Sequence, residues 1–175
     1  MTVWGEFETQ FEQSLDSESQ PWFKAWRAAQ FAQFKTLGLP DTKQEWWRTT
    51  PLAQLYRQEY ALAKNNDSTS VPACDIPRDC YVIHLQGSHI QMDGLDFPPG
   101  VMVMPLFDAI KLHGDLVKQT LGQALQHQDG FTALNSALFT NGLWIYIPQG
   151  IELEKPIFIH HVSDANHMNF SRPVS

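Results

Sequence analysis

The residues best suited to chemistry include two adjacent histidines near the end of the sequence. His160 and His161 follow the apolar run Ile157-Phe158-Ile159, which indicates a β-strand. Side chains alternate between the two faces of a strand, so we do not expect this pair to bind one metal ion together. His161 shares a face with Ile157 and Ile159, which favours an interior or corner histidine over a metal ligand.

Two cysteines are the other candidates. Cys74 and Cys80 lie in a polar segment with five residues between them. Paired cysteines of zinc sites usually stand closer, and an iron–sulfur cluster usually takes four cysteines. A phosphate-binding glycine loop ahead of Lys-Ser or Lys-Thr and a Gly-x-Ser-x-Gly motif are both missing from the sequence. We therefore assign no catalytic, cofactor-binding or metal-ligating residue, and we expect the isolated chain to bind neither iron nor nucleotide.

Composition narrows the possible partners. The chain has 175 residues, of which 43% are hydrophobic, and a formal net charge of −7. A chain of this length can bury a substantial core, and its negative charge argues against nucleic acid or an anionic membrane as the main partner. No stretch approaches the ~18 apolar residues of a membrane span, and the N-terminus does not resemble a signal peptide. We expect a cytoplasmic protein whose two cysteines stay reduced.

The first third of the sequence has helical periodicity. One amphipathic helix is indicated by apolar residues at three- and four-residue steps, namely Trp4, Phe7, Phe11 and Leu15. A second helix is predicted to begin at Pro21 and to stop at Gly38. Its core face is expected to hold Trp22, Trp26, Ala29 and Phe34.

Cap signals predict the next elements of the chain. Thr42 and Glu45 have the spacing of a capping box, and Thr50-Pro51 predicts a short helix through Leu52, Leu55 and Tyr56. Residues 64–79 are polar and contain prolines, so we expect a linker there.

The spacing of the apolar residues changes after this linker. From Cys80, short alternating runs broken by glycine and proline predict strands and turns. Helical spacing returns over 106–126, with an interruption near Gly114, and Phe131, Leu134 and Leu138 mark one more helix. We expect Asn135 in that helix to have a structural role, with its amide bonded to backbone.

The segment from Ile145 to Val162 divides into groups of six residues. The first and third residues of each group are apolar: Ile145/Ile147, Ile151/Leu153 and Ile157/Ile159. Short strands at a fixed period are typical of a solenoid, in which 145–147 and 157–159 would stack. An ordinary antiparallel meander is the alternative, because three groups are a short sample.

Two stretches resemble a known family. The stretch "GLPDTKQEWWRTTPL" looks like the N-terminal signature of the SufD branch of the SufB/SufD family. The matching residues are Glu45, Trp47, Arg48, Thr50 and Pro51, whereas Thr49 replaces the usual aromatic residue. The stretch "FTALNSALFTNGLWIYIPQGIELEKPIFI" is similar to the lead-in to that family's β-helix. The positions that fit it are Phe131, Ala133, Leu134, Asn135, Ala137, Gly142, Pro148, Gly150, Pro156 and Ile157.

The resemblance implies a scaffold subunit of the SUF machinery, which assembles iron–sulfur clusters, and no enzyme. In the SufBCD complex of this family, SufD pairs with SufB, and the ATPase SufC binds C-terminal helical domains. The cluster site and the SufC-binding region would lie beyond this chain, so the cluster and ATP belong to the whole complex. We expect an N-terminal fragment cut in its first coils, with self-association through the open β-helix end at residues Ile157 to Val162.

The expected fold class is α+β. Residues 1–63 are predicted to form a helical domain, 64–79 the linker, 80–142 a mixed lead-in of strands and helices, and 143–175 the start of a right-handed parallel β-helix. Two other functions stay open. A hexapeptide-type acyltransferase fragment would also contain groups of six residues, and a stand-alone protein-interaction module would need no site chemistry.

Overall fold

The computed structural model describes residues 3–16, 18–57, 75–86, 89–92, 94–125, 128–140 and 142–162. Cys74, most of the expected linker and the polar segment after Val162 lie outside these residues. The chain forms two compact units, each made of segments that are distant in the sequence. We call Met1–Tyr60 with His113–Phe139 the helical unit, and Ala61–Leu112 with Thr140–Pro173 the strand unit. The domain boundaries expected from the sequence stay a prediction.

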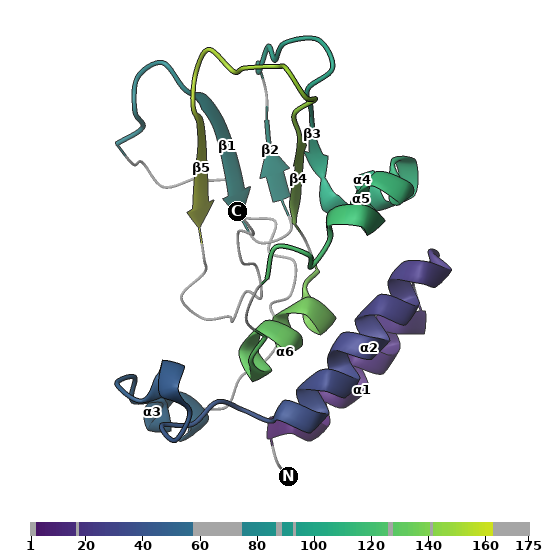
Figure 1. The fold of residues 1–175 in the computed structure, drawn as a ribbon, viewed down its shortest axis with the longest axis vertical. Coiled ribbons are helices and arrows are strands. Elements are labelled where there is room, and N and C mark those ends of the chain that lie inside the picture. The colour runs from purple at the N-terminus through teal and green to yellow at the C-terminus, as the bar shows by residue number, and fades with distance from the viewer. Residues whose placement is uncertain are drawn as a thin grey trace. The chain divides into compact units, whose positions relative to one another are not determined.

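The helical unit contains most of the helices (Figure 1). In chain order they are α1 (Val3–Asp16), α2 (Pro21–Leu37), the 3-10 helix η1 (Glu45–Trp47), α3 (Ala53–Arg57), α5 (Gly114–Thr120) and α6 (Gly130–Leu138). Helix α2 begins at Pro21 as predicted, because proline fits the first helical position. It ends at Leu37, and the cap residue is Gly38, whose φ of 66° suits glycine and whose N–H donates to the carbonyl of Phe34.

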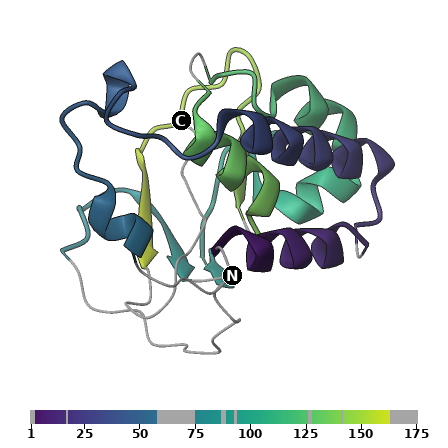
Figure 2. The same ribbon diagram turned by 90° about the horizontal axis from the view of Figure 1, so that it is seen from below.

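The core of the helical unit lies mainly between α2 and α6. Phe23 of α2 is 0% exposed, and its ring contacts that of Phe139, just after α6. The described side chains of α1 also contribute, since the rings of Phe11 and Phe31 stack 4.1 Å apart. Figure 2 shows α2 and α6 from below. Aromatic side chains therefore form a core between the helices, as predicted, although the residues that supply it differ in part from those expected.

The predicted buried face of α2 was mostly wrong, since Phe34 is the only one of its four residues that is buried. The buried residues of this helix are Phe23, Arg27, Phe31 and Phe34. Ala29 is exposed, and Trp22 and Trp26 are only half-buried. The buried face of α2 therefore includes Arg27, which a search for apolar residues does not find.

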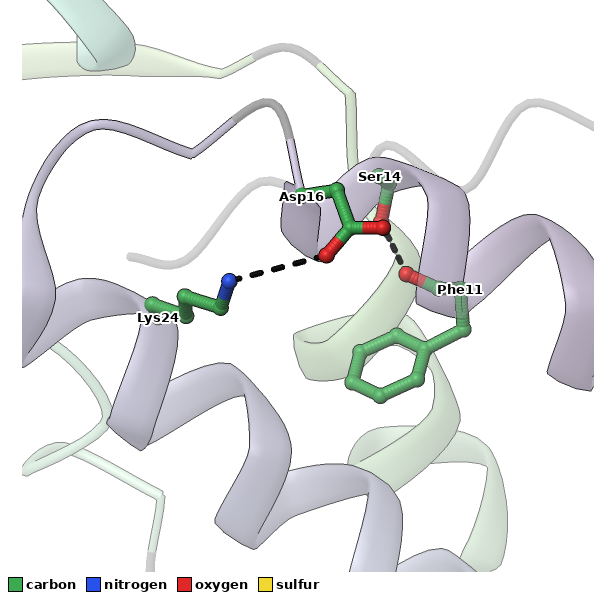
Figure 3. A network of polar contacts seen from close by, with 4 residues as sticks. All are labelled: Phe11, Ser14, Asp16 and Lys24. Atoms are coloured by element: carbon green, nitrogen blue, oxygen red, sulfur yellow. Dashed lines mark hydrogen bonds and ion pairs between the residues drawn. The ribbon is translucent and has the colours of Figure 1, made fainter.

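Figure 3 shows one polar contact within the end of α1 and one between α1 and the start of α2. Ser14 Oγ donates a hydrogen bond of 2.7 Å to the Phe11 carbonyl, one turn earlier in α1. Lys24 Nζ lies 3.7 Å from Asp16 Oδ1, with the Lys24 side chain 45% and the Asp16 side chain 88% exposed. An exposed pair of this kind contributes little stability, so the stacked rings of Phe11 and Phe31 and the contact of buried Arg27 with Ser14 matter more for the link between the two helices.

The predicted capping box does not form. The residue before η1 is Gln44, without a side-chain cap. The Glu45 carboxylate instead lies 3.5 Å from Arg48 Nη2, and Asp41 Oδ1 accepts a 2.9 Å hydrogen bond from the Lys43 N–H. Aspartate readily bonds the backbone two residues further on, which here gives a turn before η1. The short helix predicted after Thr50-Pro51 is present as α3.

The strand unit holds two small sheets. The first has the order β2–β1–β5, made of β2 (His89–Gln91), β1 (Tyr81–Gln86) and β5 (Ile157–Val162). The second pairs β3 (Met102–Pro105) with β4 (Leu143–Tyr146), and α4 (Leu106–Leu112) contacts both of these strands. Strands β1 and β2 are antiparallel, as are β3 and β4, whereas β1 and β5 are parallel.

The regular groups of six residues were only partly confirmed. Residues 145–146 and 157–159 are in strands, but 151–153 is not a strand. Gly150, with φ of 85°, forms a turn in which the Ile151 N–H bonds the Pro148 carbonyl. Pro156 has no N–H to offer to a strand ladder, so β5 begins only at Ile157.

The expected stacking of 145–147 on 157–159 is wrong. Ile145 pairs with Val103 of β3, and Ile159 pairs with Ile83 of β1. The mixture of helices and strands confirms the α+β class. No closed β-helix is seen within the described residues. None of the described helices is long and apolar enough to cross a membrane.

Candidate functional site

The parallel pairing of β1 and β5 brings two histidines together. His84 is the register partner of His160, 76 residues further along the chain. Their Nδ1 atoms are 3.2 Å apart, and the two rings are inclined at 73° with centroids 5.4 Å apart. Both side chains are half-buried. A hydrogen bond at this distance needs one ring to donate from Nδ1–H and the other to accept at Nδ1.

His161 has a different environment. It pairs in register with Leu85, and because β5 is extended here, its side chain leaves the opposite face from His160. Burial lowers the pKa of His161, and the neighbouring His160 lowers this pKa further. Thus the two adjacent histidines are not brought together, whereas His160 meets a histidine from a distant strand.

Cys80 immediately precedes β1. Its half-buried side chain is a free thiol whose Sγ lies 3.0 Å from the carbonyl oxygen of Pro77. The other cysteine, Cys74, lies outside the described residues. Within the part of the chain that the structure describes, no three His, Cys, Asp or Glu side chains are grouped so that they could hold a metal ion.

In the helical unit, the stretch that carries the signature packs on the start of α6. Asp129 caps α6 through Oδ1, which accepts a 2.8 Å hydrogen bond from the Thr132 N–H. Asp129 Oδ2 accepts a 3.0 Å hydrogen bond from the indole Nε1–H of Trp47. The Trp47 ring also meets Phe131 edge-on, with centroids 5.3 Å apart. One carboxylate therefore starts a helix and anchors an aromatic side chain that is distant in the sequence.

The same place requires two glycines. A Cβ on Gly130 would lie 1.7 Å from the carbonyl oxygen of Gly38, so no other residue fits without a backbone shift. Next to Gly38, the Pro40 carbonyl accepts a hydrogen bond from the Tyr56 hydroxyl. We call Gly38, Pro40, Trp47, Asp129 and Gly130 the signature junction. Its contacts are those of structural packing, and they give a physical reason for the glycine, proline and tryptophan of the sequence signature.

Arg27 is a charged residue in the core of the helical unit. It is only 3% exposed. Its Nε donates a 2.8 Å hydrogen bond to the carbonyl of Ala137 in α6, and its Nη2 lies 3.0 Å from Ser14 Oγ in α1. Burial lowers the pKa of Arg27, and the negative charge of Glu18 opposes that shift. A buried guanidinium with these partners fixes α1, α2 and α6 to one another.

Sequence reasoning missed three of these residues. His84 gave no signal because its partner is fixed by a parallel strand pairing between distant segments. Arg27 was passed over because a charged residue is not expected on a buried helix face. Asp129 could have been found, since an aspartate just before Gly130 and the apolar residues of α6 is a helix-start signal.

Comparison with known proteins places the chain in a family. Residues 4–159 match the family model described as "SufBD protein N-terminal region". An iron-sulfur cluster assembly SufBD family protein of Synechocystis is 39% identical over 54 residues, which cover 30% of this chain and 11% of that protein.

Two further relatives have similar coverage. A chloroplastic iron-sulfur cluster assembly SufBD family protein of Arabidopsis thaliana is 37% identical over 59 residues, covering 33% of this chain and 11% of that protein. The iron-sulfur cluster assembly protein SufB of Plasmodium falciparum is 37% identical over 54 residues, covering 30% of this chain and 12% of that protein. The matched part of the chain thus spans about a tenth of these relatives. The family model covers most of the chain, so this chain belongs to the SufBD family, with the N-terminal region of that family as its matching part.

Proposed function

We propose that this chain is the N-terminal region of a scaffold component of iron–sulfur cluster assembly. The observation that carries the proposal is the match of residues 4–159 to the N-terminal region of the SufBD family. The names of the relatives, which refer to iron–sulfur cluster assembly, support the same process. The family match also favours the scaffold over a hexapeptide acyltransferase fragment.

We assign the chain to the SufD branch rather than to SufB. The support is the stretch from Gly38 to Pro51, whose residues build the signature junction through Gly38, Pro40 and Trp47. In this role the chain has no catalytic residue of its own. It positions the start of a longer protein, which would carry the cluster and the SufC-binding region, and the whole would work in the cytoplasm with SufB and SufC.

The β1–β5 pair supports a β-helix that starts in this chain. Parallel strands need a long crossover, and β1 and β5 pair residue for residue across 76 positions of sequence. A solenoid grows by adding parallel, in-register strands, each covering the last. We place the first rung of the proposed β-helix at this pair. At its outer edge, β5 has no further strand in the described sheet, which is where a second copy would bind the isolated chain.

The test of the function is association in the native cell. The gene would be tagged at the end of its full reading frame, and the protein would be purified anaerobically from cells grown with limited iron. We expect SufB and SufC to co-purify, and the activity of cluster-dependent enzymes to fall when the gene is silenced. Recovery of an intact SufB–SufC assembly that lacks this protein, with unchanged enzyme activity after silencing, would refute the proposal.

A further inference from the structure

The histidine pair of the strand unit has the spacing of two ligands on one metal ion. His84 and His160 are register partners on adjacent parallel strands, so the backbone ladder fixes where both side chains begin. Their Nδ1 atoms are 3.2 Å apart. Two imidazole nitrogens bound to a tetrahedral Zn²⁺ at about 2.0–2.1 Å stand about 3.3 Å from each other. The distance in the protein therefore needs little change to accept an ion.

The surrounding side chains restrict which ion fits. Alternation places Gln86, His89 and Gln91 on the same sheet face as the pair. The strands β1, β2 and β5 contain no aspartate or glutamate. Hard cations such as Mg²⁺ and Ca²⁺ prefer carboxylate oxygens, whereas imidazole suits Zn²⁺, Cu²⁺ and Ni²⁺. The chemistry of this face thus selects borderline transition metals.

We propose that His84 and His160 form a two-histidine site for a divalent transition-metal ion, with Zn²⁺ as its best-fitting occupant. The remaining positions on the ion are taken by water or by a ligand from outside the described residues. When the ion binds, the ring that donates from Nδ1 transfers that proton to its Nε2, and both Nδ1 lone pairs coordinate the metal. The site uses no residue of the signature junction, but it lies on the β1–β5 pair that we propose as the first rung of the β-helix.

The experiment uses the full chain without an affinity tag, in a Cys74→Ser, Cys80→Ser background that removes the thiol ligands. Zn²⁺ is titrated by calorimetry, and Co²⁺ serves as the spectroscopic probe. We expect one ion per chain. His84→Gln and His160→Gln should each weaken binding by more than about tenfold, since even outer-shell partners of metal sites are typically worth that much.

Two matched controls separate the pair from other histidines. His89→Gln changes a neighbour on the same face, and His161→Gln changes the adjacent residue on the opposite face. Both should bind Zn²⁺ as the parent does, and circular dichroism checks that each variant is folded. Binding that survives His84→Gln, or that is equally lost in His161→Gln, would overturn the proposal.

A measurement without any histidine substitution covers the case in which a variant does not fold. Bound Co²⁺ is paramagnetic, so it should broaden the backbone amide signals around residues 84 and 160 before those of the helical unit. Broadening centred elsewhere, or the absence of binding to the parent chain, would mean that a hydrogen bond alone joins the two rings.

Discussion

The helical unit and the strand unit keep their shape in different ways. Most buried apolar residues of the described chain belong to the helical unit, where side chains such as Phe23 and Arg27 join distant segments. The strand unit depends more on backbone ladders, and several of its large apolar residues stay exposed, among them Leu112, Ile147, Ile151 and Ile159. The difference indicates that the helical unit encloses its own core, whereas the strand unit offers apolar surface that a neighbour can cover.

The largest effect is expected where two backbones touch in the helical unit. Gly130→Ala should lower the free energy of unfolding by about 3 kcal/mol, at the upper end for overpacking, because the added Cβ meets the Gly38 carbonyl oxygen. Gly114→Ala is the matched control, since its Cβ would lie 3.5 Å from Trp22 Nε1, an ordinary contact. Urea unfolding of both variants measures the difference. Similar midpoints would show that the close approach of Gly38 and Gly130 is not needed.

The next effect compares two adjacent tryptophans. Trp47→Ala should cost about 2–3 kcal/mol, because a half-buried indole and its hydrogen bond to Asp129 are lost. Trp46→Ala should change stability by less than about 0.5 kcal/mol, since Trp46 is 74% exposed. His160→Ala, measured with a chelator present, should also cost less than Trp47→Ala. Equal melting temperatures for the Trp47 and Trp46 variants would contradict the role of Trp47 as an anchor.

Substitutions at the β5 edge of the strand unit should affect stability less. They should instead change whether two copies of the chain associate. The isolated chain should self-associate through β5, and Ile159→Lys should reduce its mass in light scattering towards that of a monomer. Ile151→Lys is the control, because Ile151 has the same 37% exposure as Ile159 but lies outside the strand. A parent chain that is already monomeric, or an equal effect of both substitutions, would argue against pairing through β5.

The sequence predicted the elements better than it predicted their partners. Helix α2 (Pro21–Leu37) was found because the proline at its start and the glycine just after its end act locally on the backbone. The β1–β5 pairing was not predicted, because nothing near Tyr81 specifies a strand 76 residues away. The six-residue period failed at Ile151, where the turn at Gly150 takes precedence over an apolar alternation of only three residues. Local signals were therefore enough for the helices, while the histidine pair needed the tertiary structure.

The smallest predicted effect concerns the ionisation of Tyr56 beside the signature junction. Burial raises the pKa of Tyr56, and the negative charges of Asp41 and Asp129 raise it further. Because the pKa of Tyr56 in the folded state lies above the unfolded value of about 10, the folded state holds the phenolic proton up to a higher pH. The stabilisation is therefore complete below about pH 10 and decreases as the pH rises through the folded pKa.

Two variants test this assignment by tyrosinate absorbance and by unfolding between pH 9 and 12. Tyr56→Phe should remove the part of the tyrosinate absorbance that appears at the highest pH. It should also reduce the loss of stability at alkaline pH, once the difference in stability between variant and parent at neutral pH is subtracted. Asp129→Asn should lower the pKa of Tyr56 while keeping a good N-cap for α6, because asparagine caps helices about as well as aspartate. The absorbance lost in Tyr56→Phe could instead titrate at an ordinary tyrosine pH, or its midpoint could stay unchanged in Asp129→Asn. Either result would show that the charges of Asp41 and Asp129 do not raise the pKa of Tyr56. The ring contact between Tyr56 and Phe131, 6.3 Å between centroids, would still join α3 to the start of α6.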